Sequence, residues 1–526
     1  MMERNVSKFT ALFLVLLLTL SLLGTSVFAI GSDEKGTITV SGVEDGVTVT
    51  AYRLMTVNYD YDKDSPVDPE YEWVDAVADW LKTNYPAYEN IENFNNTVSD
   101  SDIAAFYDKL SAAIKSGDIT LAEAGTGTGS CSIGGLEMGN YLILIENGMK
   151  VYRPSAVNLV PTYQDGAWIM TTPATVNVKA SEPEIDKTIN EQNTTDGHYI
   201  GAGRGTLGAD NANIGGTVTF DLRSDIPQYP ENATAKGYKV SDKLSDGLTL
   251  DETSIKVFGD DSNEPLTEGY EIKTDAGLTN EAGKDVTFIV TFDYEKIKQY
   301  SKIHIRYNAT LNAGAVIGTP GNPNTAYLDY NNNPYSANSW KTKDDEVKVY
   351  SYGIDVSKTD KSSGASLSGA EFTLSANKDG SSPIKFILVS EGVYRAALSG
   401  EADSVETLSV GASADLTGKL TLTGLDAGTY YLTETKAPAS YNKLSGPVEI
   451  QITDSDWDGG VNVTIENAPQ DIDSGLVPVT VPNGQGFELP TTGGAGTILF
   501  ATVGVLLMGA GLLLFRAIGR KHNRTE

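Results

Sequence analysis

Three polar side chains are predicted on apolar faces of strands in the last third of the chain. Side chains alternate between the two faces of a β-strand, so residues two apart share a face. Lys358 continues the face of Ile354 and Val356, and Glu434 and Asn467 continue apolar faces of two later strands. Burying a charge is costly unless it is partnered. We therefore expect this amine, carboxyl group and carboxamide to meet in the core.

A second set of the same three groups lies earlier in the chain. Lys187 lies between Ile185 and Ile189 on one face, while Asp242 and Asn324 project from the apolar faces of two other predicted strands. The repetition predicts a second buried cluster of amine, carboxyl group and carboxamide. In both sets, a hydrogen-bonded core cluster that never reacts is the alternative.

The elements that position these residues are predicted to be mostly β-strands. Short alternating runs rich in Val, Thr, Tyr and Ile are separated by Gly, Asn and Asp turns. The exception lies between residues 68 and 119, where Trp73, Val77 and Leu81, and then Phe106 and Leu110, recur at helical spacing. We predict an all-β fold of tandem Ig-like sandwiches, with two helices inserted in the first domain.

Shifts in composition divide the chain. Ser181–Glu184 reads as a short linker, and the stretch after residue 469 reads as an acidic spacer punctuated by Pro and Gly. The predicted parts are a first domain with a strand at its end (30–180), a middle domain (181–349), a third domain (350–469) and a spacer (470–488).

Both ends of the chain carry hydrophobic segments. Arg4 and Lys8 precede a Leu-rich run, and Val27–Ala29 offers small residues for cleavage, which predicts a signal peptide over 1–29. Residues 497–515 form an uncharged stretch of roughly membrane-spanning length. The basic tail at 516–526 would hold that end in the cytoplasm. The sequence thus predicts an exported protein whose precursor is tethered at its C-terminus.

Composition excludes several classes of function. The formal net charge of −31 argues against a partner with a phosphate backbone, so no nucleic acid is expected. The single cysteine, Cys131, cannot form an intrachain disulfide. Three scattered histidines are too few for a zinc site or a hydrolase triad, and no glycine loop for phosphate is found. Two acidic loops, 60–64 and 454–459, begin like calcium loops but lack a Glu at position 12. We expect no metal and no cofactor.

Leu489, Pro490, Thr491, Thr492 and Gly493 stand directly before the apolar stretch and the basic tail. This order of Leu-Pro-x-Thr-Gly, span and tail resembles the sorting signal of Gram-positive surface proteins. In that family a sortase cysteine attacks the Thr–Gly bond and passes the Thr carbonyl to an amine. The resemblance implies cleavage of the Thr492–Gly493 bond and attachment to peptidoglycan. The alternative is an ordinary tail anchor in which the pentapeptide arose by chance.

Two domains also resemble a known family. The later domain is similar to a Cna B-type domain in three places: Lys358–Asp360, the Glu-Thr-x-Ala-Pro segment Glu434–Pro438, and the end of the domain at Asn467. Asp242 and the segment Asn324–Tyr330 are similar to the middle domain of sortase-assembled major pilins of the Spa type. The resemblance implies isopeptide bonds Lys358–Asn467, assisted by Glu434, and Lys187–Asn324, assisted by Asp242. Each bond would join the first strand of its domain to the last.

The implied reaction has a physical basis. Burial disfavours the ammonium form, so the lysine becomes a neutral nucleophile. Burial also keeps the carboxylic acid protonated, so that it can polarise the asparagine carbonyl. The first domain lacks the pattern, because Ile145 stands where the acid would be and Lys35 lies off the apolar face. We expect no such bond there.

Lys179 is predicted to face solvent, because it has the opposite parity from Val176 and Val178. Together with Trp168, this segment resembles the pilin motif of backbone pilins, although Asn177-Val178 replaces the usual Tyr-Pro. In that family the lysine accepts the Thr carbonyl of another subunit, here Thr492. The alternative is an ordinary solvated lysine.

The sequence is therefore interpreted as the major subunit of a sortase-assembled pilus (fimbria), a structural protein with a role in adhesion and colonisation, rather than a conventional enzyme. Its expected partners are pilin-specific and housekeeping sortases, identical subunits joined head to tail, minor tip and base pilins, peptidoglycan, and a host or environmental ligand. The main alternative is a monomeric wall-anchored adhesin, with its binding site in the helical insertion of the first domain. A secreted hydrolase with accessory β domains is a weaker one.

Overall fold

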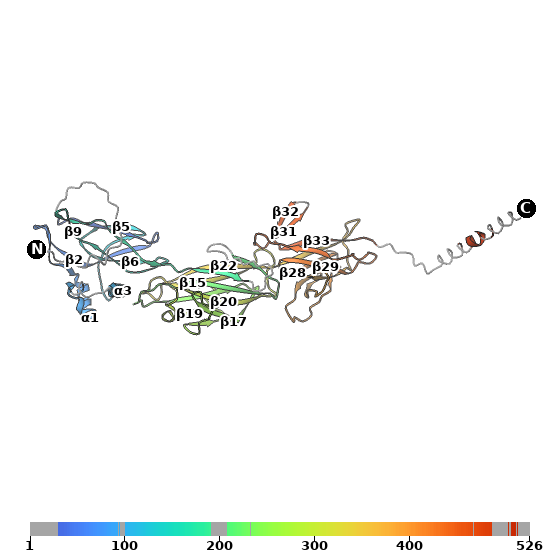
Figure 1. Cartoon of the computed structure of the whole chain (residues 1–526), viewed down its shortest axis with the longest axis horizontal. Helices are drawn as coiled ribbons and strands as arrows, with labels where there is room; N and C mark the ends of the chain where they lie inside the picture. Colours follow the sequence, from blue (N-terminus) through green and yellow to red (C-terminus); the bar gives the residue numbers. More distant parts are fainter. Residues whose placement is uncertain are drawn as a thin grey trace, which may run out of the picture. The chain divides into compact units, whose positions relative to one another are not determined.

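The computed structural model describes residues 30–92, 94, 100–190, 208–231, 233–465, 468–485, 503, 506–511 and 513. The predicted signal peptide, Asn467 and the pentapeptide Leu489–Gly493 lie outside these residues, as does most of the predicted span over 497–515. Within the described residues, no helix is long and apolar enough to cross a membrane. The chain forms two compact units, and strands predominate in both (Figure 1).

The first domain belongs to the first unit and contains two main sheets. Its core is formed by the inward faces of these sheets, including Ile38, Val40 and Ile143. The three-stranded sheet has the order β11 (Ala174–Asn177), β1 (Gly36–Ser41) and β5 (Cys131–Leu136). The other sheet has the order β3 (Ser65–Trp73), β2 (Thr48–Asp60), β6 (Gly139–Glu146) and β8 (Ser155–Leu159), with β4 (Glu123–Thr128) also paired to β2.

The two helices expected in the first domain are present. They are α1 (Asp75–Asn84) and α3 (Asp100–Ser116), with the short 3-10 helix η2 (Pro86–Tyr88) between them. Their apolar stripes form a second cluster against the sheet, in which Val77, Phe106 and Leu110 are completely buried. The helical spacing read from the sequence therefore identified the correct faces.

Short strands complete the first domain and the segment that leads to the middle domain. β9 (Pro161–Gln164) and β10 (Ala167–Met170) form a hairpin. β12 (Ala180–Ser181) pairs with β7 (Val151–Tyr152), so the start of the predicted linker is held in a two-stranded sheet.

The middle domain consists of two sheets that face one another, because side chains from both meet in its core. One has the order β13 (Ile185–Asn190), β15 (Thr217–Asp225), β20 (Lys302–Leu311) and β17 (Leu248–Gly259). The other has the order β14 (Gly208–Asn211), β22 (Trp340–Tyr350), β21 (Asn322–Asn331), β16 (Tyr238–Leu244), β19 (Phe288–Phe292) and β18 (Tyr270–Lys273). A single helical turn, α4 (Tyr294–Ile297), follows β19.

The second unit contains the third domain together with the segments 211–216 and 312–321. One sheet has the order β25 (Phe386–Ser390), β26 (Val393–Ala396), β28 (Lys419–Leu425), β23 (Tyr352–Asp360) and β33 (Leu476–Asn483). The other has the order β27 (Leu408–Ser409), β24 (Glu371–Ser375), β29 (Gly428–Lys436) and β30 (Val448–Ile452). A separate hairpin is formed by β31 (Val461–Ile465) and β32 (Ala468–Ile472).

The segment 470–488, expected to be a spacer, instead contributes structure to the third domain. It holds the end of β32 and all of β33, which runs parallel to β23 at the edge of the sheet. Pro478 and Pro482 obscured this strand in the sequence, but an edge strand tolerates proline because one side of its backbone has no partner. The last strand of the domain is therefore β33, and not the strand that ends at Ile465.

Candidate functional site: two buried lysine clusters

The middle-domain cluster joins the two facing sheets. Lys187 and Tyr307 project from β13 and β20 of one sheet, and Asp242 and Asn324 project from β16 and β21 of the other. Lys187, Asp242 and Asn324 are completely buried. In the pairing of β16 with β21, Asp242 lies opposite Ala326 and Leu244 lies opposite Asn324, so the acid and the asparagine are diagonal neighbours on one face.

Hydrogen bonds connect these side chains. The Nζ of Lys187 forms a very short ion pair with Oδ2 of Asp242 and donates to the Tyr307 hydroxyl at 3.1 Å. The Nδ2 of Asn324 donates to the same hydroxyl at 2.7 Å. Oδ1 of Asp242 and Oδ1 of Asn324 are both buried and accept no hydrogen bond from a described residue. The hydrogen-bonding capacity of the cluster is therefore only partly used.

Burial shifts both charged groups of this cluster toward their neutral forms. It lowers the pKa of Lys187, and the nearby Asp242 carboxylate opposes this shift only in part. It raises the pKa of Asp242 to about 6, against the opposing effect of the Lys187 amine. A neutral amine is a nucleophile and a protonated carboxyl group is a hydrogen-bond donor. Burial thus moves both groups toward the neutral forms that amide chemistry requires.

The third-domain cluster has a different geometry. The Nζ of Lys358 is in very short contact with Oδ1 of Asn483 and donates to the backbone carbonyl of Val481 at 2.8 Å. The Nδ2 of Asn483 donates to Oε1 and Oε2 of Glu434 at 2.9 and 3.1 Å. Lys358, Glu434 and Asn483 are all buried, and burial lowers the pKa of Lys358. Here the amine already lies against the carboxamide, and the acid holds the amide nitrogen.

Asn483 replaces Asn467 as the carboxamide beside Lys358. Asp360 pairs with Asn483 in the parallel ladder of β23 and β33. Lys358 lies two residues before Asp360 on the same face, so Lys358 and Asn483 are diagonal neighbours. Asn467 lies outside the described residues, and the hairpin that flanks it is not part of either sheet of the sandwich. The alternation of Val477, Val481 and Asn483 is the sequence signal for the correct residue, but the prolines between them give the segment the composition of a spacer.

Lys179 lies between β11 and β12, and its side chain is exposed as predicted. The carbonyl of Lys179 accepts a hydrogen bond from the backbone N–H of Arg153 at 2.9 Å. Val178 is buried, and Trp168 packs against the core of the first domain. The lysine backbone is therefore fixed while its amine remains accessible.

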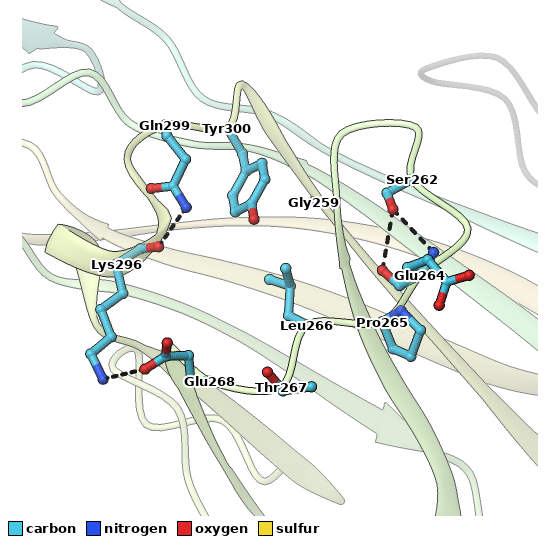
Figure 2. Close-up of a pocket in the computed structure, with 10 residues that line it drawn as sticks. All are labelled: Gly259, Ser262, Glu264, Pro265, Leu266, Thr267, Glu268, Lys296, Gln299 and Tyr300. Carbon is cyan, nitrogen blue, oxygen red and sulfur yellow. Dashed lines mark hydrogen bonds and ion pairs between the residues drawn. The ribbon is translucent and has the colours of Figure 1, made fainter.

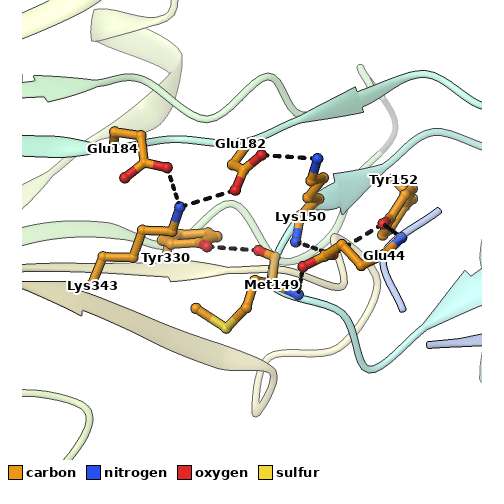
Figure 3. Close-up of polar contacts among 8 residues, drawn as sticks. All are labelled: Glu44, Met149, Lys150, Tyr152, Glu182, Glu184, Tyr330 and Lys343. Atoms are coloured by element: carbon orange, nitrogen blue, oxygen red, sulfur yellow. Dashed lines mark hydrogen bonds and ion pairs between the residues drawn. The ribbon is translucent and has the colours of Figure 1, made fainter. Parts of the chain in front are cut away.

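Ion pairs and hydrogen bonds also fix the linker that follows Lys179. Figure 3 shows Glu182 between two amines, Lys150 at 2.9 Å and Lys343 at 3.4 Å. Glu184 pairs with Lys343 as well. The hydroxyl of Tyr330, from the middle domain, donates to the carbonyl of Met149 in the first domain at 2.6 Å. The predicted linker is thus held by both of its neighbours.

Three family models match successive parts of the chain. They describe the Cna-B-like domain of Gram-positive pilin backbone subunit 2 (residues 214–334), a prealbumin-like fold domain (353–468) and an LPXTG cell wall anchor motif (481–525). The three matches follow one another as a pilin backbone domain, a second β domain and a cell wall anchor. With the relatives described next, they support a Gram-positive backbone pilin.

Individual proteins are similar to this pilin along most of its length. The trypsin-resistant surface T6 protein of Streptococcus pyogenes serotype M6 is 25% identical, over 92% of this chain and 95% of that protein. The fimbrial subunit type 1 of Actinomyces viscosus is 26% identical, over 59% of this chain and 62% of its own. The solved structure of the T6 backbone pilin matches with a TM-score of 0.56 at 18% identity, covering 87% of this chain and 99% of that one, which supports the fold. The protein is thus a cell-wall-anchored structural subunit.

In the two acidic loops of the pilin, carboxylates accept local hydrogen bonds. Ligand oxygens of Asp454, Asp456 and Asp458 lie within 4.8 Å of one another. Asp454, however, already accepts hydrogen bonds from the Tyr352 hydroxyl at 2.7 Å and from the Gly459 N–H at 2.9 Å. In the other loop, Asp60 accepts hydrogen bonds from successive backbone N–H groups, as in an ordinary turn.

A cavity of about 540 Å³ opens in the middle domain of the pilin (Figure 2). Its wall includes an ion pair between Lys296 and Glu268 at 2.8 Å, and both side chains are largely exposed. The wall contains no residue of either lysine cluster. It offers no converging set of buried polar groups, so we assign it no function.

Proposed function

We propose that this pilin polymerises through a bond between Thr492 of one subunit and Lys179 of the next. A pilin-specific sortase would cleave the Thr492–Gly493 bond and transfer the Thr492 carbonyl to the Nζ of Lys179. Repetition gives a head-to-tail fibre, because a heterologous contact adds subunits without limit unless its rotation closes a ring. A housekeeping sortase would then attach the fibre to peptidoglycan, and minor pilins would occupy its tip and base.

The observation that carries this proposal is the contrast between two lysines eight residues apart. Lys179 is exposed on a fixed backbone, whereas Lys187 is completely buried. Only the exposed amine is accessible to a separate enzyme, and the buried amine is accessible only to its own domain. We therefore assign Lys179 to the link between subunits and Lys187 to a link within the subunit.

The link within the middle domain would join Lys187 to Asn324, assisted by Asp242. The lone pair of Nζ attacks Cγ of Asn324, the Cγ–Nδ2 bond breaks, and ammonia leaves. Lysine amine plus carboxamide thus becomes a secondary amide plus ammonia, with no oxidant or cofactor needed. The protonated Asp242 carboxyl group would stabilise the negative charge that develops on Oδ1 of Asn324.

The link within the third domain would join Lys358 to Asn483, assisted by Glu434. The very short contact of Nζ with Oδ1 of Asn483 brings amine and carboxamide together before reaction. Closing a loop of more than a hundred residues in this way stabilises the folded state on the order of 5 kcal/mol by loop-closure entropy.

An immunoblot of wall extracts boiled in detergent tests the joint between subunits. Wild-type extracts should give a ladder of high mass, and Lys179→Ala should reduce it to monomer. Lys63→Ala is the matched control, because Lys63 is another exposed lysine of the first domain. A ladder that persists in Lys179→Ala would show that another lysine links the subunits. A single monomer band in the wild type would favour the non-polymerising adhesin.

A further inference from the structure

Tyr307 is part of the middle-domain cluster, although the pattern of lysine, acid and asparagine does not include it. Its ring is almost completely buried. It stacks against Phe220 at 5.3 Å between centroids and meets the edge of Phe288 at 5.0 Å. These two rings, one from each sheet, hold the hydroxyl of Tyr307 in a fixed place.

That hydroxyl lies between the two nitrogens whose bonding would change. It is 3.1 Å from Nζ of Lys187, which would become the amide nitrogen, and 2.7 Å from Nδ2 of Asn324, which would leave as ammonia. In the structure both nitrogens donate to this hydroxyl. A phenolic hydroxyl can also donate, so it can give its own proton to Nδ2 once addition of Nζ to Cγ makes that nitrogen basic. Burial raises the pKa of Tyr307 well above its usual value, so the hydroxyl keeps its proton.

In the third domain a side chain also accepts from the nitrogen that would leave. There the leaving nitrogen, Nδ2 of Asn483, is held by both oxygens of Glu434. In the middle domain Asp242 is ion-paired with the lysine instead, and the hydroxyl of Tyr307 accepts from Nδ2 of Asn324. Tyr307 therefore stands where the acid stands in the third domain.

We propose that Tyr307 is a catalytic residue that carries a proton from Nζ of Lys187 to Nδ2 of Asn324. The proposal rests on the middle-domain isopeptide bond proposed above. After Nζ adds to Cγ, the nitrogen of Lys187 carries one proton too many and Oδ1 carries a negative charge. Nζ passes that proton to the oxygen of Tyr307 while the original hydroxyl proton moves to Nδ2. The Cγ–Nδ2 bond then breaks, ammonia leaves, and Tyr307 ends as it began.

The test follows the cross-link in time after cell-free synthesis of the whole ectodomain. Intact mass counts the ammonias lost, and peptide mapping identifies the peptide that joins Lys187 to Asn324. Tyr307→Phe should slow that link by about 100-fold, as loss of a general acid–base group does, while the Lys358–Asn483 link forms at the wild-type rate. Tyr238→Phe, a buried tyrosine on the strand of Asp242, should leave both rates unchanged.

Three outcomes are distinguishable. An equally fast Lys187–Asn324 link in Tyr307→Phe would overturn the role of Tyr307 and leave the cross-link itself intact. A wild type without this link would refute the cross-link on which the inference rests. To separate reaction from folding, Tyr307→Phe is also made in an Asn324→Ala background, where no link can form. We expect it to leave the melting temperature there nearly unchanged, and a large drop would assign Tyr307 a structural role instead.

Discussion

Lys187 and Lys358 are the only lysines in the described part of the chain that are completely buried, and their surroundings differ. Lys187 is ion-paired with Asp242, whereas Lys358 contacts the carbonyl oxygen of Asn483 and has Glu434 at 3.8 Å. A buried charge with incomplete partners strongly destabilises a fold. Conversion of each amine into a neutral amide would remove that cost permanently.

The choice of asparagine in the third domain gives a prediction at the residue scale. Asn483→Ala should abolish the Lys358 link, because it removes the carboxamide that contacts Nζ, and Asn467→Ala should not. Each ectodomain is weighed intact against the mass of its own sequence. We expect Asn467→Ala to be light by two ammonias, like the wild type, and Asn483→Ala by one. The reverse result would return the link to Asn467.

At the scale of elements, alternation along strands predicted much of the candidate site. It placed Lys187, Asp242, Asn324, Lys358 and Glu434 on inward faces, and the structure buries all five. The rule works because a strand in a sandwich has one face in the core, and a shift of one residue would expose every apolar side chain.

The same reasoning failed where strand signals were weak or where pairing is not local. Prolines and neighbouring glycines weaken the strand pattern of β33 in the sequence. Its parallel pairing with β23 is not encoded in any local pattern. The middle-domain link was expected to reach the last strand, yet Asn324 lies on β21 and β22 follows it. Tyr307 was missed because an inward-facing tyrosine is an ordinary core residue until its hydroxyl partners are known.

The contribution of β33 can be tested by moving the end of the chain. A protein that ends at residue 475 lacks β33, so the backbone of β23 loses a ladder partner and Lys358 loses its neighbour. We expect a lower melting temperature for the third domain and one ammonia fewer lost than in a protein that ends at residue 485. Equal melting temperatures and masses for the two proteins would show that β33 is dispensable.

At the scale of the whole molecule, the two links would define how the chain bears tension. A pull applied between Lys179 and the C-terminus would pass from Lys187 directly to Asn324 and from Lys358 directly to Asn483. Residues 188–323 and 359–482 would then be bypassed and could not be extended. In single-molecule pulling, we expect no unfolding step from these segments in the wild type. Asn324→Ala should release a step of roughly 450 Å, and a similar step in the wild type would contradict the links.

The position of Lys179 at the exit of the first domain has a consequence for variation among such proteins. In a fibre joined at this lysine, residues 30–178 are a side branch of the covalent backbone, attached only through Lys179. A sequence change that loosens this domain would leave the connected fibre intact, whereas the same change in the middle domain could prevent its cross-link from forming. Mutations should therefore accumulate more freely in the first domain. That domain is the part of the subunit most open to acquiring new loops and new surface specificities.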